Sequence, residues 1–247
     1  MRIEKIGAAT LYLGDCLEIM TQLDAVDHII CDPPYEAFIH KMKNELARRI
    51  RADRGPDLKP LDFDSIDSIR SDVVRLGAAL SNGWFIAFCT PEGVWLWADE
   101  INHSTMKYKR ACVWVKPDAT PQLNGQGPAQ GAENFVCAWA GDSYARWNAG
   151  GKRGVYTHCT NNSEREGTHP TEKPRRLMAE IIGDFTMDAQ TILDPFMGSG
   201  TTGVAAVQMG RNFIGIEREP KYFDIACRRI EQAQRQGDMF IERASNG

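Results

Sequence analysis

Four consecutive residues, Asp32-Pro33-Pro34-Tyr35, combine a carboxylate, a rigid turn and an aromatic ring. The two prolines fix φ and remove two amide donors, so carbonyl oxygens remain as acceptors beside the Asp32 carboxylate. Such acceptors would bind the hydrogens of a planar amino group, and a base would stack on the flat Tyr35 ring. The tetrapeptide therefore predicts a site for a base with an exocyclic amino group; a proline-stiffened turn with a half-buried tyrosine is the alternative.

A second group of residues, near the C-terminus, has the pattern of a nucleotide-binding turn. An apolar run leads into Gly198 and Gly200, and a helix is expected to follow, in which Thr201 or Thr202 would bind the first free amides. Glu217 ends the next expected strand, 19 residues after Gly198, where dinucleotide-binding units carry the acid that accepts the ribose hydroxyls. The third glycine of the dinucleotide pattern is missing, which favours a ribose-containing cofactor without phosphates. A plain strand-to-helix turn beside a solvated glutamate is the alternative.

The elements that must position these residues follow from hydrophobic periodicity. Apolar runs predict strands at residues 10–14, 27–31, 84–88, 111–115, 134–140, 192–194 and 212–216. Helical spacing of apolar residues predicts helices at residues 17–23, 65–80, 91–101 and 175–185. This alternation predicts one α/β domain over residues 1–247 with a doubly wound, mostly parallel sheet. Because ligands bind at the carboxyl ends of such strands, Asp15, Asp32, Asp194 and Glu217 are expected to converge.

Both motifs together resemble those of the S-adenosylmethionine-dependent DNA amino-methyltransferases. Asp32-Pro33-Pro34-Tyr35 matches the catalytic motif of that family, and residues 194–202 match its cofactor motif. The match continues through Gly14-Asp15, residues 169–174 and residues 210–217. Because the catalytic motif comes first, the chain resembles the permuted β group. The resemblance implies a Rossmann-like, circularly permuted, seven-stranded methyltransferase sheet.

The resemblance also implies the cofactor, S-adenosyl-L-methionine, with S-adenosyl-L-homocysteine as the product and no metal. Residues 169, 171 and 173 are implied to line the cofactor pocket, with Lys173 near the cofactor carboxylate; an ordinary lysine at a helix entry is the alternative. The expected catalytic residues are Asp32, Pro33, Pro34 and Tyr35. The expected cofactor-binding residues are Asp15, Cys16, Asp32, His169, Thr171, Lys173, Asp194, Pro195, Phe196, Gly198, Ser199, Gly200, Thr201, Thr202 and Glu217.

Composition indicates a globular protein of the cytoplasm. Of the 247 residues, 43% are hydrophobic and 25% charged, no apolar run has the length of a membrane helix, and the N-terminus has no apolar signal core. Seven cysteines occur without a C-x-x-C pair, which favours reduced thiols over disulfides or zinc. His158, Cys159 and His169 also lack metal-ligand spacing. The sequence therefore predicts no membrane contact and no metal site.

Charge is distributed unevenly along the chain. Residues 41–54 carry six basic and two acidic side chains, although the formal net charge is −4. Such a stretch favours contact with a polyanion or is a solvated helix face. Two segments, residues 36–62 and 118–167, are candidate DNA-recognition inserts; the second is otherwise a surface loop. The candidate DNA contacts are Lys41, Lys43, Arg48, Arg49, Arg51, Arg146, Arg153 and Asn161, side-chain types that bind phosphates or base edges.

The expected reaction is transfer of a methyl group to the N6 atom of an adenine flipped out of double-stranded DNA. The resemblance favours adenine because aspartate at the first motif position is typical of adenine enzymes, whereas serine is typical of N4-cytosine enzymes. An N4-cytosine enzyme is the alternative within the class. A nucleotide-dependent oxidoreductase or a noncatalytic DNA-binding module are alternatives from other classes, but the oxidoreductase leaves residues 32–35 unexplained. The resemblance also implies a homodimer, and a cognate restriction endonuclease is a candidate partner.

Overall fold

The computed structural model describes residues 1–36, 65–120, 127–160 and 172–245. Within these residues, nine strands form one sheet in the order β1-β2-β9-β8-β3-β4-β6-β5-β7. The strands are β1 (Arg2–Ile6), β2 (Ala9–Leu13), β3 (His28–Cys31), β4 (Trp84–Cys89), β5 (Lys107–Val115), β6 (Ala132–Trp139), β7 (Val155–Thr157), β8 (Thr191–Asp194) and β9 (Asn212–Glu217). The five central strands from β2 to β4 are mutually parallel. The predicted doubly wound, mostly parallel sheet is therefore confirmed.

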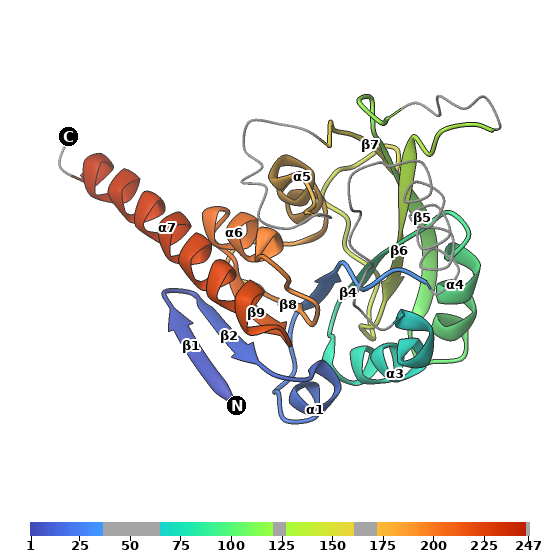
Figure 1. Ribbon diagram of the computed structural model, residues 1–247, viewed down its shortest axis with the longest axis horizontal. Helices are drawn as coiled ribbons and strands as arrows, with labels where there is room; N and C mark the ends of the chain where they lie inside the picture. Colours follow the sequence, from blue (N-terminus) through green and yellow to red (C-terminus); the bar gives the residue numbers. More distant parts are fainter. Residues whose placement is uncertain (37–64, 121–126, 161–171, 246–247) are drawn as a thin grey trace, which may run out of the picture.

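Helices cover both faces of the sheet (Figure 1). One face carries α1 (Cys16–Met20), α3 (Arg70–Leu80) and α4 (Val94–Asn102), and the other carries α5 (Arg175–Phe185), α6 (Thr201–Gln208) and α7 (Pro220–Ser245). The predicted helix at residues 65–80 begins as a short 3₁₀ turn, η1 (Ile66–Ser68), and becomes α-helical at Arg70. The segment from Lys221 to Ser245 forms most of a long helix that the sequence analysis did not predict.

The strands β3 and β4 are buried on both faces, and β4 is apolar throughout. In β4, Trp84, Ile86 and Phe88 pack with the α5, α6 and α7 side, whereas Phe85 and Ala87 pack with the α1, α3 and α4 side. Side chains of a strand alternate between faces, so a strand that lies between two helix layers needs a continuous apolar run. The strand β3 follows the same rule, and all four of its residues are buried.

The two sheet edges add strands to the seven that the sequence predicts. At one edge β1 pairs antiparallel with β2, and at the other β7 pairs parallel with β5. The alternative that residues 118–167 are a surface loop is wrong for β7, because Tyr156 is fully buried and donates to Asp184 at 2.7 Å. A single buried aromatic residue leaves no periodic signal, so the sequence pattern missed this strand.

The order of the strands in the sheet does not follow the order of the chain. The N-terminal strand β2 pairs in parallel with the C-terminal strand β9, with Ala9 opposite Phe213 and Leu13 opposite Glu217. The strand β8, which leads into the glycine turn, lies directly beside β3, which leads into Asp32-Pro33-Pro34-Tyr35. Joining the two chain ends would give a continuous doubly wound order, so the predicted circular permutation agrees with the topology.

Candidate active site

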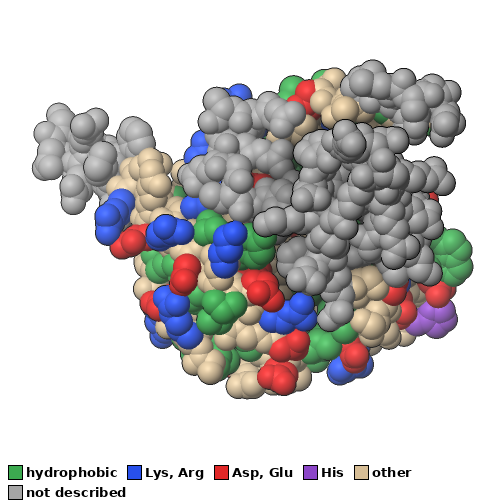
Figure 2. Space-filling model, viewed as in Figure 1, with side chains coloured by type: hydrophobic (Ala, Val, Ile, Leu, Met, Phe, Trp, Pro, Cys, Tyr) green, Lys and Arg blue, Asp and Glu red, His purple; other side chains and the backbone are tan. Residues whose placement is uncertain are grey.

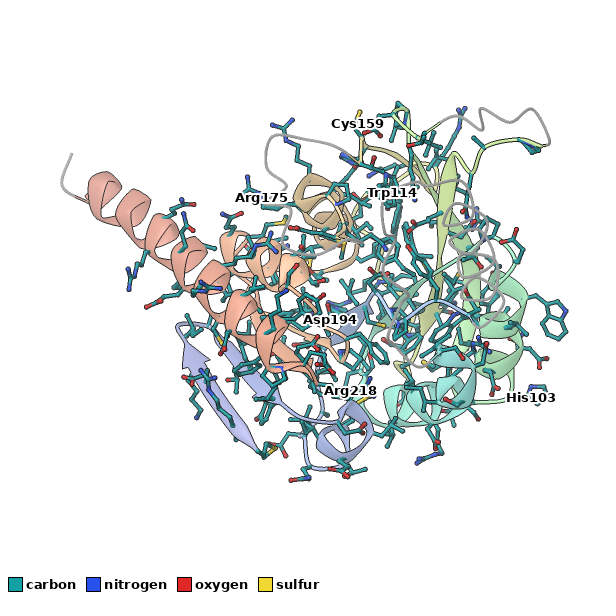
Figure 3. All side chains as sticks on the ribbon, in the orientation of Figure 1. His103, Trp114, Cys159, Arg175, Asp194 and Arg218 are labelled. Atoms are coloured by element: carbon teal, nitrogen blue, oxygen red, sulfur yellow. The ribbon has the colours of Figure 1, made fainter. Side chains whose placement is uncertain are left out.

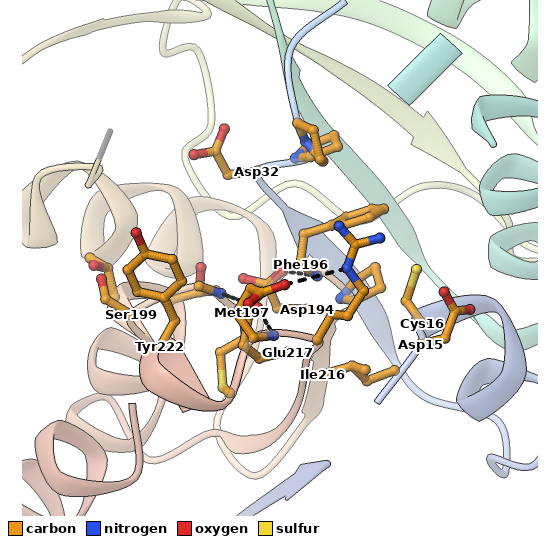
Figure 4. Close-up of a pocket in the computed structure, with 18 of the residues that line it drawn as sticks. Asp15, Cys16, Asp32, Asp194, Phe196, Met197, Ser199, Ile216, Glu217 and Tyr222 are labelled. Atoms are coloured by element: carbon orange, nitrogen blue, oxygen red, sulfur yellow. Dashed lines mark hydrogen bonds and ion pairs between the residues drawn. The ribbon is translucent and has the colours of Figure 1, made fainter. Parts of the chain in front are cut away.

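The carboxyl ends of four adjacent parallel strands meet at one edge of the sheet. Asp194 and Glu217 are the last residues of β8 and β9, Asp32 follows β3 directly, and Asp15 lies two residues after β2. A cavity of about 350 Å³ opens at this edge, and Figure 4 shows Asp32 on its upper side and Glu217 on its lower side. The predicted residues that line this cavity are Asp15, Cys16, Asp32, Pro33, Pro34, Tyr35, Lys173, Asp194, Pro195, Phe196, Gly198, Ser199, Thr201, Thr202 and Glu217.

The glycine turn separates into a cavity residue and a packing residue. Both Gly198 and Gly200 have positive φ angles, 54° and 84°, which favour glycine. Gly198 lines the cavity, with open space where a Cβ would lie. Gly200 is the N-cap of α6, and a Cβ there would lie 2.9 Å from the Cβ of Ala226 in α7. The second glycine therefore lets α7 approach α6 closely.

The threonines after the turn do not cap α6 as the sequence analysis expected. The N-cap of α6 is Gly200, without a side-chain hydrogen bond. The Thr201 hydroxyl instead donates to Glu172 at 3.3 Å, and the Thr202 hydroxyl binds the carboxylate of Asp194. Their hydroxyls bind carboxylates at the cavity, which a capping rule based on sequence position does not predict.

Glu217 links the turn after β8 to the ends of β9 and β2. Its two carboxylate oxygens accept from the amides of Gly198 at 2.8 Å and Glu219 at 2.7 Å. Its backbone carbonyl accepts from the Gly14 amide at 3.0 Å. Burial raises the pKa of Glu217, and these amide hydrogen bonds oppose the rise. A third backbone amide, that of Arg218, also donates to this carboxylate, and since a carboxylate has about four lone-pair sites, it retains capacity for a ribose hydroxyl.

Asp194 is buried below this turn, with 1% of its surface exposed. Burial raises its pKa to about 7, against hydrogen bonds from the Thr202 hydroxyl and the Phe196 amide that lower it. The Phe196 amide lies 3.0 Å from the Asp194 carboxylate. The carboxylate therefore shapes the turn that presents the half-buried Phe196 ring to the cavity.

The Asp32 carboxylate has a partner that the sequence analysis placed elsewhere. The Lys173 ammonium donates to both oxygens of Asp32, at 2.7 Å each, and lies 3.2 Å from Glu133. Burial raises the pKa of Asp32, and the Lys173 charge opposes this rise. Burial lowers the pKa of Lys173, but Asp32 and Glu133 outweigh it and raise this pKa well above its ordinary value. Lys173 lines the cavity as expected, with its ammonium bound to Asp32 and Glu133.

Two further side chains of this cluster, Glu133 and Lys116, were not singled out in the sequence. Glu133, the second residue of β6, accepts hydrogen bonds from the Lys116 ammonium and, at 3.2 Å, from the Tyr35 hydroxyl. Burial works to raise the pKa of Glu133, but Lys173 and Lys116 outweigh it and lower the pKa to about 2. The sequence signal that could have pointed to Glu133 is its place at the start of a mostly apolar run that forms a strand.

Glu172 is another acid that sequence reasoning did not single out. It lines the cavity, forms an ion pair with Arg229 and accepts from the Thr201 hydroxyl. Its second carboxylate oxygen is buried and has no hydrogen-bond partner among the described residues. The neighbouring Asp15 is the N-cap of α1 and accepts from the Leu17 and Glu18 amides. The cavity therefore has an acceptor that its surroundings leave unused.

The candidate DNA contacts are only partly within the described residues. His169 and Thr171 of the expected cofactor site lie outside them, as do Lys41, Lys43, Arg48, Arg49, Arg51 and Asn161. Arg153 is exposed next to β7. Arg146 lines a smaller cavity of about 150 Å³ with His28 and Gln190, at the amino ends of β3 and β8. The structure therefore places Arg146 at the sheet edge opposite Asp32.

Charged side chains of the described surface show no single basic patch in the view of Figure 2, where acidic and basic groups are interspersed.

Within the same residues, no group of three or more histidine, cysteine or acidic side chains is arranged to hold a metal ion. The exposed Cys159 lies far from Asp194 and from His103 (Figure 3). A search of the described helices for one that is long and apolar enough to span a bilayer found none.

The fold and the paired motifs define a Rossmann-like methyltransferase. A family model described as DNA methylase matches residues 26–228, and its name covers N6 and N4 enzymes. The chain belongs to this DNA methylase family, so the prediction of a DNA amino-methyltransferase is confirmed, and DNA is the substrate of the family.

Individual proteins agree with this assignment. The type II methyltransferase M2.DpnII of Streptococcus pneumoniae is 30% identical over 84% of this chain and 83% of its own length. The type II methyltransferase M2.LlaDCHI of Lactococcus lactis subsp. cremoris is 28% identical over 93% and 91%. The solved complex of M1.HpyAVI with SAM has a TM-score of 0.67 and 29% identity, over 90% of this chain and 98% of that one. These matches extend over nearly the whole chain.

Proposed function

We propose that this chain transfers a methyl group from S-adenosyl-L-methionine to the N6 atom of an adenine flipped out of double-stranded DNA. The observation that carries the proposal is that the Asp32-Pro33-Pro34-Tyr35 turn and the Gly198 to Glu217 cradle open into one cavity. Aspartate at the first motif position favours adenine over cytosine. The type II methyltransferase relatives and the neighbour solved with SAM support the same reaction.

The residues of the cavity fit this cofactor. The Glu217 carboxylate at the end of β9 has acceptor capacity left for a ribose hydroxyl, and the half-buried Phe196 ring offers a face for the adenine moiety. The buried oxygen of Glu172 that has no partner among the described residues is an acceptor of the kind that an amino acid ammonium group needs. Expected contacts from His169 and Thr171 fall outside the described residues. When bound, the cofactor supplies an electrophilic methyl group on a sulfonium sulfur.

The catalytic turn acts on the target base. A base inside a duplex cannot reach the cavity, so the adenine must leave the stack, and stacking on Tyr35 offsets part of that cost. Asp32 and the Pro33 carbonyl accept the two amino hydrogens, which favours a pyramidal, nucleophilic nitrogen aimed at the methyl group. Positioning and electrostatics supply most of the acceleration. The nitrogen becomes more acidic once methylated, so Asp32 need not be a strong base to receive its proton.

DNA contact is proposed for the inserts at residues 36–62 and 118–167 of this single catalytic domain. The basic stretch at residues 41–54 and the exposed Arg153 support phosphate contact. We also propose a homodimer, since one chain offers little groove-reading surface, and a cognate restriction endonuclease, since the relatives are type II enzymes. The DNA substrate supports a cytoplasmic location.

The test is to incubate the purified protein with radiolabelled S-adenosylmethionine and unmethylated genomic DNA, and to separate the nucleosides after digestion. We expect label in N6-methyladenine, and none with the Asp32→Ala variant. Label in N4-methylcytosine would keep the mechanism and change the base. Micromolar cofactor binding without label in DNA would contradict the proposed substrate.

A further inference from the structure

Glu133 is a buried acid close to the catalytic turn that belongs to neither sequence motif. It lies on β6, with 8% of its side chain exposed, opposite Trp114 of β5. The residues that bind it come from three separate segments: Lys116 follows β5, Tyr35 lies in the catalytic turn, and Lys173 precedes α5. A buried carboxylate is costly unless it is paired, so these contacts hold the three segments at one point.

Two of these contacts reach the catalytic turn from different sides. One Glu133 oxygen accepts from the Tyr35 hydroxyl at 3.2 Å, and the other lies 3.2 Å from the Lys173 ammonium, which donates to both Asp32 oxygens at 2.7 Å. The Lys173 nitrogen also lies 5.0 Å from the centre of the Phe88 ring. The ammonium therefore lies among two carboxylates and an aromatic face, with 5% of its side chain exposed.

We infer that Glu133 is a positioning residue for methyl transfer, which acts on Asp32 through Lys173 and on Tyr35 through the phenol hydroxyl. The inference rests on the proposed function. Glu133 fixes the ammonium that orients the Asp32 carboxylate and fixes the ring on which the flipped base stacks. Lys116 supplies a second positive charge to Glu133 and lies 4.5 Å from the centre of the Trp114 ring. Glu133 itself does not contact the reacting atoms.

Glu133 affects the ionisation of Asp32 in two opposite ways. It holds the Lys173 ammonium beside Asp32, and its own negative charge repels that of Asp32. Lys173 and, more weakly, Lys116 favour the ionised form of Asp32, whereas the negative charge of Glu133 opposes it, and Asp194 opposes it when it is itself ionised. While Lys173 is present, Glu133 favours the ionised form of Asp32 indirectly, because it holds the Lys173 ammonium in place. Without Lys173, only the repulsion between the two carboxylates remains.

The first measurement is the steady-state kinetics of Glu133→Gln, which removes the charge and retains the shape. We expect kcat to fall about tenfold to a hundredfold, as misplacement of catalytic groups does, and the Kd for S-adenosylmethionine to stay within about twofold. The matched control is Asp184→Asn. Asp184 also binds a lysine ammonium and a tyrosine hydroxyl, those of Lys152 and Tyr156, but does not line the cavity.

The deciding measurement repeats Glu133→Gln in a Lys173→Met background. If Glu133 acts through Lys173, the second change leaves kcat unchanged or raises it, because it removes the repulsion that acts on Asp32. An equal fall of kcat in both backgrounds would show that Glu133 does not act on Asp32 through Lys173 and would overturn the inference. Wild-type kcat for Glu133→Gln would also overturn it. If the wild-type protein itself transfers no methyl group, the proposed function fails instead.

Discussion

The ammonium nitrogen of Lys173 lies 2.7 Å from each carboxylate oxygen of Asp32, although 141 residues separate the two in the chain. This contact joins the catalytic turn after β3 to the segment that precedes α5. A lysine within the stretch that resembles a cofactor motif therefore binds Asp32, the proposed catalytic acid. Asp32 and Lys173 therefore form one ion pair between the segment at residues 32–35 and the segment at residues 169–174.

Replacement of Asp32 by asparagine should abolish most methyl transfer. The variant loses the negative charge that accepts amino hydrogens, so kcat should fall about 10³-fold, whereas the cofactor cradle around Glu217 stays intact. The measurements are initial rates with labelled cofactor and the Kd for S-adenosylmethionine. A kcat within about tenfold of the wild-type value would remove Asp32 from the mechanism.

Lys173→Met should move the acid limb of the kcat profile to higher pH. Burial already raises the pKa of Asp32, and Lys173 opposes that rise, so loss of the ammonium raises this pKa further. Since Asp32 acts in its ionised form, the variant should lose more activity at pH 6 than at pH 9. Lys173→Arg keeps the charge and should keep the limb near its wild-type position. A limb that moves to lower pH in Lys173→Met would contradict this assignment.

Glu217→Gln should weaken cofactor binding more than it weakens turnover. The carboxylate offers charge-assisted hydrogen bonds to the ribose, worth about 1.5 to 3 kcal/mol each, so the Kd for S-adenosylmethionine should rise about tenfold to a hundredfold. Calorimetric titration measures this change directly. The control is Glu231→Gln, which removes an exposed pair with Arg235 on α7. An unchanged Kd in Glu217→Gln would exclude the ribose contact.

Asp194→Asn should stabilise the protein in neutral solution and not in acid. Burial raises the pKa of Asp194 to about 7 from its ordinary 3.8, so the folded protein holds a proton that the unfolded chain releases. The wild-type free energy of unfolding should therefore fall between about pH 4 and pH 7, by a few kcal/mol. Urea unfolding of both proteins at pH 5 and pH 8 checks this. Equal pH dependence of the two proteins would refute the raised pKa.

Alanine at Arg48, Arg49 and Arg51 together should weaken DNA binding and flatten its salt dependence. The slope of log K against log salt should shrink by about 0.9 for each phosphate that the variant no longer neutralises. Arg146→Ala is the matched control, because Arg146 lies at the opposite sheet edge from Asp32. An unchanged slope in the triple variant would exclude phosphate binding by these arginines.

The sequence predicted the parts of the site that parallel strands position. Asp15, Asp32, Asp194 and Glu217 each follow or end an apolar run, so their convergence follows from parallel pairing alone. Contacts made by Glu133 depend instead on the register of the β5–β6 hairpin, which has an irregularity between Tyr108 and Arg110. Sequence periodicity does not determine such a register.

Other features escaped prediction because they depend on single long-range contacts. Tyr156 makes β7 part of the sheet through its burial and its bond to Asp184. Arg146 lies at the amino ends of β3 and β8, where its backbone carbonyl accepts a hydrogen bond from the Trp84 indole at 2.5 Å. Nothing in the composition of residues 141–157 distinguishes these positions from an exposed loop.

The pairing of β2 with β9 sets the time at which the enzyme is completed during synthesis. Residues 9–13 pair with residues 213–217. The growing chain therefore contains Asp32-Pro33-Pro34-Tyr35 long before the segment from Gly198 to Glu217 has been made. Contacts of such sequence separation slow folding, because a long loop must close before they form. Among the described strands β9 is made last, so a chain truncated before residue 212 would lack the strand that ends on Glu217.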